Sequence, residues 1–231
     1  MLQPLYKKLF SKTYKPALGS AIIKAIKWWK HALHTSASRI IGLSSDEIDF
    51  VIYTDASCEP INHSSSSDSD VSEDTKYLGI IGAVILDKKL HQEGFDGSFD
   101  VCFSRAAPNE INILFEDTSL IYAFGLLAVV LTLFELRFAL RNKTALFFVD
   151  NNAALCALIR GAAHHPMVDR YIATFWAIAA EFNIAVWFER VSSASNIADF
   201  PPREIPPPSP CLVETIFSKW NEFHELAIMI F

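Results

Sequence analysis

Five short apolar segments, and the way they are joined, constrain the fold of this chain most strongly. Each segment is rich in β-branched and aromatic residues, which favour β-strands. The first three segments follow one another without an intervening helical pattern, whereas helical segments precede and separate the last two. This order predicts an α/β fold with a five-stranded mixed sheet flanked by helices. The segments are DFVIYTDAS (49–57), YLGIIGAVILD (77–87), SFDVCFSR (98–105), KTALFFVD (143–150) and NIAVWFERV (183–191).

Helical patterns fill most of the remaining chain. The apolar residues of segment 18–33 recur at helical spacing. Segment 151–161 begins with Asn and ends with Gly, the residues that favour helix starts and ends. Pro166 opens a further helical segment. We also expect an amphipathic helix over about 211–228.

The longest apolar run, SLIYAFGLLAVVLTLF (119–134), allows two interpretations. It holds 16 residues without a charge, and Glu135 follows at once. A membrane-spanning helix needs about 20 apolar residues, so a helix buried against the sheet is the preferred interpretation. A membrane span is the alternative.

Composition and charge indicate the class of protein and a basic N-terminal part. With 51% hydrophobic residues, the 231-residue chain can bury a sizeable core. Its four cysteines are far apart and form no CxxC pair, which predicts a reduced intracellular chain, in the cytoplasm or the nucleus, without a zinc or disulfide framework. The net charge is −6, yet residues 1–45 hold seven Lys, one Arg and no acid. A basic arm of this kind is typical of nucleic-acid contacts, and a solvated helix face is the alternative.

These features predict three parts. Residues 1–45 form a basic helical segment, and residues 46–204 form the main domain. Within that domain, residues 62–76 are Ser and acidic residues with almost no apolar content, which predicts a disordered loop. Residues 205–231 form a Pro-rich linker followed by the C-terminal helix.

Three carboxylates are placed where an α/β sheet usually has its site. Asp55 and Asp150 each end a predicted strand, and Asp199 follows the last one. If the first and fourth strands are parallel neighbours, their carboxylates meet at one edge. Three carboxylates at one point repel each other unless a cation is present, and oxygen ligands favour Mg²⁺ or Mn²⁺. Two such ions about 4 Å apart can cleave a phosphodiester. Each Asp could instead be a helix cap or turn residue.

The segments that carry these residues also resemble a known family. IYTDAS, IGAVIL, FFVDNNAAL and RVSSASNIADFPPR follow the order found in the ribonuclease H domain of retroelement reverse transcriptases, DIRS-like or related. The upstream LQPLYKKL and AIKWWKHAL are similar to the thumb or connection segment before such a domain. The resemblance covers about residues 1–204.

The resemblance implies a ribonuclease H-like fold and metal-dependent hydrolysis of the RNA strand of an RNA–DNA hybrid. Asp55 would bridge two metal ions, and Asp150 and Asp199 would each complete one site. It also implies an upstream polymerase domain that this chain lacks. Substrate-binding residues would be Ser57, Asn151 and Asn196.

The chain departs from the family at one position of the long helix. The family carries a Glu in a motif like E-L-L-A, whereas this chain reads AFGLLAVVL with Gly125 in that place. Glu135 lies about 15 Å further along the helix, so only an acid of the preceding segment, such as Glu110 or Glu116, could replace it. Activity is therefore expected to be weak or lost. The alternatives are a non-catalytic connection or scaffold domain of this fold, and a DNA-directed nuclease of the same superfamily.

Overall fold

The computed structural model describes residues 19–35, 48–60, 77–87, 101–106, 119–199, 213–214 and 220–230. The chain divides into two compact units, residues 1–44 and residues 45–231. The first contains helix α2 (Ser20–Thr35). The second holds the sheet and the remaining helices. The predicted disordered loop at 62–76 lies outside the described residues.

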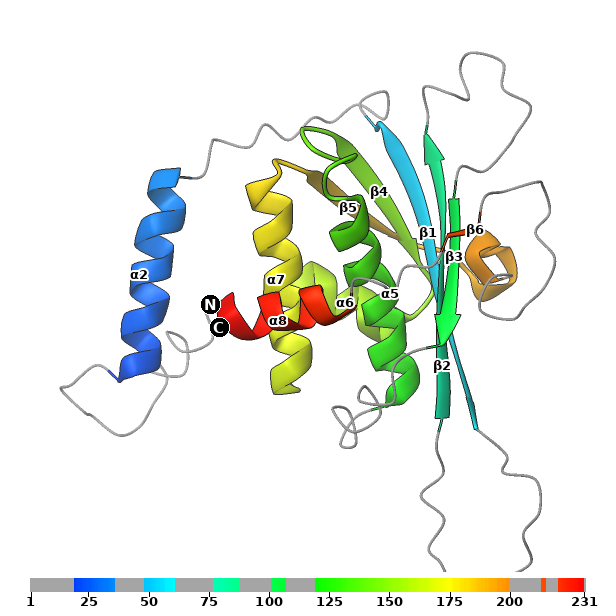
Figure 1. The fold of residues 1–231 in the computed structure, drawn as a ribbon, viewed down its shortest axis with the longest axis horizontal. Helices are drawn as coiled ribbons and strands as arrows, with labels where there is room; N and C mark the ends of the chain where they lie inside the picture. Colours follow the sequence, from blue (N-terminus) through cyan, green and yellow to red (C-terminus); the bar gives the residue numbers. More distant parts are fainter. Residues whose placement is uncertain are drawn as a thin grey trace, which may run out of the picture. The chain divides into compact units, whose positions relative to one another are not determined.

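A mixed sheet in the order β5-β4-β1-β2-β3-β6 forms the centre of the second unit (Figure 1). Strands β1, β2 and β3 form an antiparallel meander, and β4 and β5 run parallel to β1 on its other side. All five predicted strands are present, and the ribonuclease H-like fold is confirmed by this order. The strands are β1 (Phe50–Pro60), β2 (Tyr77–Asp87), β3 (Val101–Ala106), β4 (Thr144–Val149), β5 (Ala185–Arg190) and β6 (Val213–Glu214).

The sixth strand corrects two predictions. Cys102 and Phe103 of β3 pair with Val213 and Glu214, so the sheet has six strands and not five. The helix predicted from about residue 211 is therefore wrong over its first turn, and α8 spans Trp220–Ile230. The sequence pattern fits a helix there, but the open edge of β3 supplies backbone partners that local spacing does not reveal.

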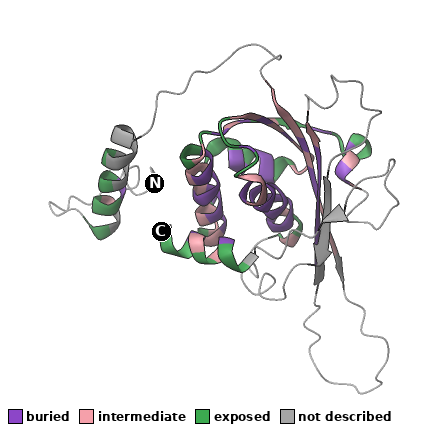
Figure 2. Ribbon diagram, turned by 45° about the horizontal axis from the view of Figure 1, so that its top comes forward, coloured by how far each residue is buried: buried purple, intermediate pink, exposed green. Residues whose placement is uncertain are grey.

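Helix α5 (Leu120–Leu136) corresponds to the long apolar run. Twelve consecutive residues, Ala123–Phe134, are buried, so the helix is enclosed on every side. Figure 2 shows this as an almost continuous purple helix against the sheet. A helix that is apolar all round suits such a position. Among the described residues, the helices are all too short or too polar to cross a membrane.

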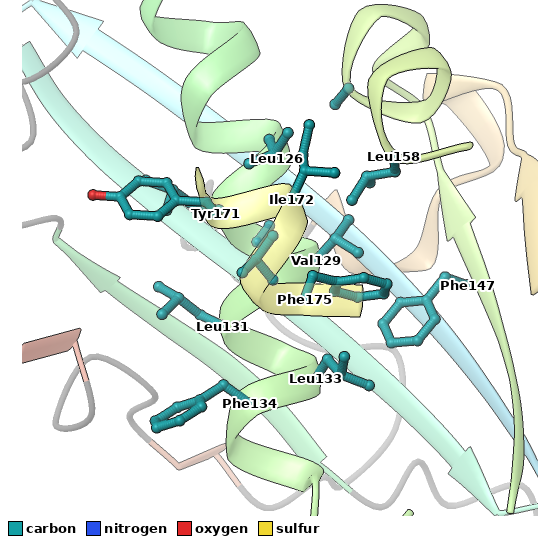
Figure 3. Close-up of a cluster of buried hydrophobic side chains, with 14 of the residues drawn as sticks. Leu126, Val129, Leu131, Leu133, Phe134, Phe147, Leu158, Tyr171, Ile172 and Phe175 are labelled. Atoms are coloured by element: carbon teal, nitrogen blue, oxygen red, sulfur yellow. The ribbon is translucent and has the colours of Figure 1, made fainter. Parts of the chain in front are cut away.

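Four helices cover one face of the sheet: α5, α6 (Asn152–Arg160), α7 (Pro166–Glu181) and α8 (Figure 1). Their buried side chains join those of the strands in one core. Figure 3 shows Phe175 of α7 beside Phe147 of β4, with a distance of 6.2 Å between ring centroids. This core holds the strands in the positions from which the site residues project.

The opposite face carries two short 3-10 helices, η2 (Ser193–Ser195) and η3 (Ile197–Asp199). Ala198 is fully buried and packs with Val84 of β2, and Ile197 and Tyr53 join the same small cluster. This contact fixes the segment that follows β5 against β1 and β2. It therefore determines where Asp199 lies.

A close approach between α5 and β2 depends on one glycine. A Cβ atom at Gly79 would lie 2.0 Å from Cζ of Phe124, which is far shorter than a van der Waals contact. The ring of Phe124 is fully buried against this part of the strand. Gly79 therefore lets α5 lie close to the sheet.

Candidate active site

Asp55 lies within β1, at the point where the parallel neighbour ends. The last pair between β1 and β4 is Thr54 with Val149, and Asp55 is the next residue of β1. Strand β1 continues to Pro60 beside β2, where Asp55 pairs with Gly82. The prediction that Asp55 ends its strand is therefore wrong, because β2 supplies backbone partners beyond that point. The carboxylate is 5% exposed.

Asp150 directly follows β4 and precedes α6. Its carboxylate accepts a hydrogen bond from Oγ of Ser193, at 3.1 Å. Ser193 belongs to η2, so this bond links the end of β4 to the segment after β5. Asp150 is half-buried and remains open to solvent.

Asp199 is held in place by Asn196. The Asn196 side chain is 6% exposed and donates from Nδ2 to the carbonyl oxygen of Thr54, at 3.0 Å. Its Oδ1 accepts from the backbone N–H of Ala198, at 3.2 Å, and its carbonyl oxygen accepts from the N–H of Asp199, at 3.1 Å. These bonds attach η3 to β1 next to Asp55.

The surroundings of Asp55 raise the pKa of its carboxyl group to about 8. Burial is the largest cause, followed by a side-chain hydrogen bond with Asp199 and by the negative charge of Asp150. A hydrogen bond with the Ala56 backbone acts in the opposite direction. The structure thus brings Asp55, Asp150 and Asp199 together as predicted.

A pocket of about 270 Å³ opens beside Asp55 and Asp150. It lies between β1, the first turns of α5, the start of α6 and η2. Its remaining wall consists of Ala56, Ile121, Gly125, Asn151 and Ser193. Gly125 therefore stands at the pocket, which is where the resemblance places the missing Glu.

The donor chemistry of this pocket fits a divalent cation. Oδ2 of Asp55 is buried and has no hydrogen-bond partner among the described residues. A buried carboxylate oxygen without a donor is costly unless a cation or proton compensates it. Within the described part of the chain, no three His, Cys, Asp or Glu side chains already form a coordination shell. The side chains of the three carboxylates would therefore have to move closer together to coordinate an ion.

The acids expected to replace the missing Glu belong to the segment before α5. Glu110 and Glu116 both lie outside the described residues. The site as described therefore contains three carboxylates.

The predicted substrate-binding residues have different surroundings. Ser57 is two residues beyond Asp55 on β1, so the two side chains share a face of the strand. Asn151 lines the pocket and caps α6, because its Oδ1 accepts from the N–H of Ala154 at 3.0 Å. Both ends of the Asn196 amide are bonded inside the protein, which gives this side chain a positioning role. Contacts of all three with substrate stay a prediction.

Sequence reasoning missed Ser193 and Ile121. Ser193 is an exposed residue in a run of small polar residues, and nothing in that run distinguishes it from its neighbours. Ile121 is 44% exposed at the start of a helix that is otherwise buried. Only its exposure, which the sequence does not show, separates it from the core residues of α5.

Comparisons with known proteins give fold likenesses at low identity. The ribonuclease H1 of the halophilic archaeon Halobacterium salinarum matches with a TM-score of 0.42 and 14% identity, over 68% of this chain and 96% of that one. LC11-RNase H1 in complex with an RNA/DNA hybrid matches with a TM-score of 0.44 and 16% identity, over 67% and 94%. No family model and no curated protein matches the chain.

Proposed function

We propose that residues 46–204 form a metal-dependent nuclease domain that hydrolyses the RNA strand of RNA–DNA hybrids, with low activity because of Gly125. One observation carries the proposal. The buried Oδ2 of Asp55 has no hydrogen-bond partner among the described residues, beside two further carboxylates and an open pocket. Such an arrangement favours cation binding over a purely structural role.

Asp55, Asp150 and Asp199 would hold Mg²⁺ or Mn²⁺. A bound divalent ion supplies charge for the phosphate oxygens and lowers the pKa of a water molecule. Ser193 orients the Asp150 carboxylate through its hydroxyl, and Asn196 positions the segment that carries Asp199. Burial of Asp55 excludes water from its side of the pocket, which strengthens each electrostatic contact there.

The substrate and the cellular context come from the resemblance of the sequence motifs. Domains of this kind hold the hybrid by its shape and backbone, and the 2′-hydroxyl groups mark the RNA strand. The acidic body of the chain supplies little phosphate affinity, so we expect an upstream polymerase domain of a retroelement reverse transcriptase to hold most of the hybrid. The proposed location is the cytoplasm or the nucleus, because the spacing of the four cysteines is not that of a disulfide framework.

A second candidate function is a non-catalytic connection or scaffold domain that binds nucleic acid or a partner protein. The neighbourhood of Gly125 favours this candidate, because the Asn151 side chain lies where a fourth carboxylate would enter the pocket. The two candidates differ in whether the domain cleaves phosphodiester bonds.

The experiment is cleavage of an end-labelled RNA–DNA hybrid in Mg²⁺ and in Mn²⁺. The full chain is compared with Asp55→Asn, which keeps the size of the side chain but removes its charge. DNA duplex and RNA duplex of the same sequence serve as substrate controls. We expect slow cleavage of the hybrid's RNA strand by the full chain and at least tenfold less by Asp55→Asn.

Equal cleavage by both chains would indicate a contaminating nuclease and would contradict the proposal. Cleavage of the DNA duplex at the same rate would replace it with the DNA-directed nuclease. Hybrid binding without cleavage, in the full chain and in the variant that combines Gly125→Glu with Asn151→Gly, would support the scaffold function.

A further inference from the structure

We infer that the Asn151 side chain has taken the space of a fourth metal ligand, so that the pocket holds one divalent ion instead of two. This inference rests on the proposed function, because it concerns the same carboxylates. It assigns to Asn151 the role of filling the space beside position 125.

The first step is the direction in which residue 125 faces. A Cβ atom added to Gly125 would lie 3.2 Å from both Cβ and Nδ2 of Asn151 and 3.4 Å from its Cγ. The side chain of Asn151 therefore crowds a Cβ atom at position 125 and would have to shift by a few tenths of an ångström to admit it. Both residues line the same pocket as Asp55 and Asp150, so this crowding lies in the wall of that pocket.

The second step is that Asn151 is held in this position from both sides. Its Oδ1 accepts from the N–H of Ala154 at the start of α6, at 3.0 Å. Its Nδ2 donates to the carbonyl oxygen of Ile121 in the first turn of α5, at 3.3 Å. The carboxamide thus links α5 to α6 directly over Gly125.

The third step concerns the chemistry that remains for an ion. The carboxamide oxygen is engaged with Ala154, and the NH₂ group that faces Gly125 is a donor, which repels a cation. On the α5 side, the pocket therefore offers no anionic ligand among the described residues that line it. The remaining anionic ligands are Asp55, Asp150 and Asp199, which lie in β1, directly after β4 and in η3. Their three negative charges suit one divalent ion better than two divalent ions.

The experiment counts bound Mn²⁺ by electron paramagnetic resonance, which detects the free ion. Each full chain is compared with the same chain carrying Asp55→Asn, so that weak binding elsewhere cancels. The variants are Gly125→Glu, Asn151→Gly and the two combined. Glycine at 151 removes the Cβ that crowds position 125, and glycine is a tolerated helix cap.

We expect one site-specific ion for the unmodified chain, for Gly125→Glu and for Asn151→Gly, and two for the combined variant. Two ions in the unmodified chain would overturn the inference while leaving the proposed function intact. No ion that depends on Asp55 would overturn both. A second ion in Gly125→Glu alone would show that Asn151 does not block the position.

A thermal measurement provides a second readout that does not depend on metal. Gly125→Ala adds only the Cβ atom. We expect it to lower the unfolding temperature of the unmodified chain, because of the contact at 3.2 Å, and to raise that of Asn151→Gly, because alanine favours a helix more than glycine does. A rise of the same size in both backgrounds would contradict the crowding.

Discussion

Asp55 is a buried acid whose charge is poorly compensated when no cation is present. Its pKa of about 8 lies above the ordinary value of 3.8, so the folded chain binds this proton more tightly than the unfolded chain. This contribution to stability is complete below about pH 4 and is lost as the pH rises toward 8. We predict that the unmodified chain, in EDTA, loses about 1–3 kcal/mol of its free energy of unfolding between about pH 5 and about pH 8 because of Asp55. The Asp55→Asn chain should lack this loss.

Urea unfolding of both chains at the two pH values checks this prediction. Groups far from Asp55 titrate equally in the two proteins, so their contributions cancel in the difference. If the free energy of unfolding changed with pH by the same amount in both chains, the pKa of Asp55 would not be raised by folding and the prediction would be wrong.

Asn196 holds the segment that carries Asp199 against β1. We predict that Asn196→Asp, which keeps the acceptor for Ala198 but loses the donor to Thr54, lowers stability by about 1–3 kcal/mol. Hybrid cleavage should fall more than tenfold, because η3 loses its hydrogen bond to β1 and Asp199 is held less firmly. Ser195→Ala, on an exposed neighbour, is the matched control and should change both values little. An Asn196→Asp chain that lost stability but cleaved normally would argue against the positioning role.

Gly79 and Phe124 set the distance between α5 and the sheet. We predict that Gly79→Ala destabilises the fold by about 1–3 kcal/mol, because the added methyl group overlaps the Phe124 ring. Phe124→Leu in the same chain should recover part of the loss, since the smaller side chain leaves room. Urea unfolding of both single variants and the double variant measures the coupling. Additive effects would contradict the contact.

Helix α8 belongs to the core through Phe223. This side chain is fully buried, with its ring centroid 5.5 Å from that of Phe134 and 5.4 Å from that of Tyr171. We predict that Phe223→Ala lowers the free energy of unfolding by about 3–5 kcal/mol. Met229→Ala, on the same helix but 76% exposed, is the control and should have little effect. Equal effects would mean that α8 does not dock as described.

Much of the fold could be predicted from the sequence because the strands and helices carry clear local patterns. The apolar and β-branched residues of β4 indicate a strand, and the way the segments are joined indicates a mixed sheet. Strand β6 could not be predicted, because its partner is an edge far away in the sequence. The path of β1 beyond Asp55 likewise depends on β2.

The acidic residues of the candidate site could be predicted from the sequence, but the side-chain contacts around them could not. Asp55 and Asp150 stand beside each other because parallel strands place them there, which the pattern indicates. The hydrogen bond from Ser193 to Asp150 and the contact of Asn151 with Gly125 depend on side-chain directions in three dimensions. No spacing in the sequence specifies such contacts.

At the scale of the whole molecule, the central claim is that a divalent cation binds at one place, the edge where β1 passes the end of β4. The most direct test is a titration of the isotope-labelled full chain with Mn²⁺, followed by amide NMR spectra. Paramagnetic broadening marks the residues nearest the ion. We predict that the amide signals of Ala56, Asn151 and Asp199 broaden first, and that Asp55→Asn prevents this. Broadening that begins elsewhere, or that survives Asp55→Asn, would contradict the claim.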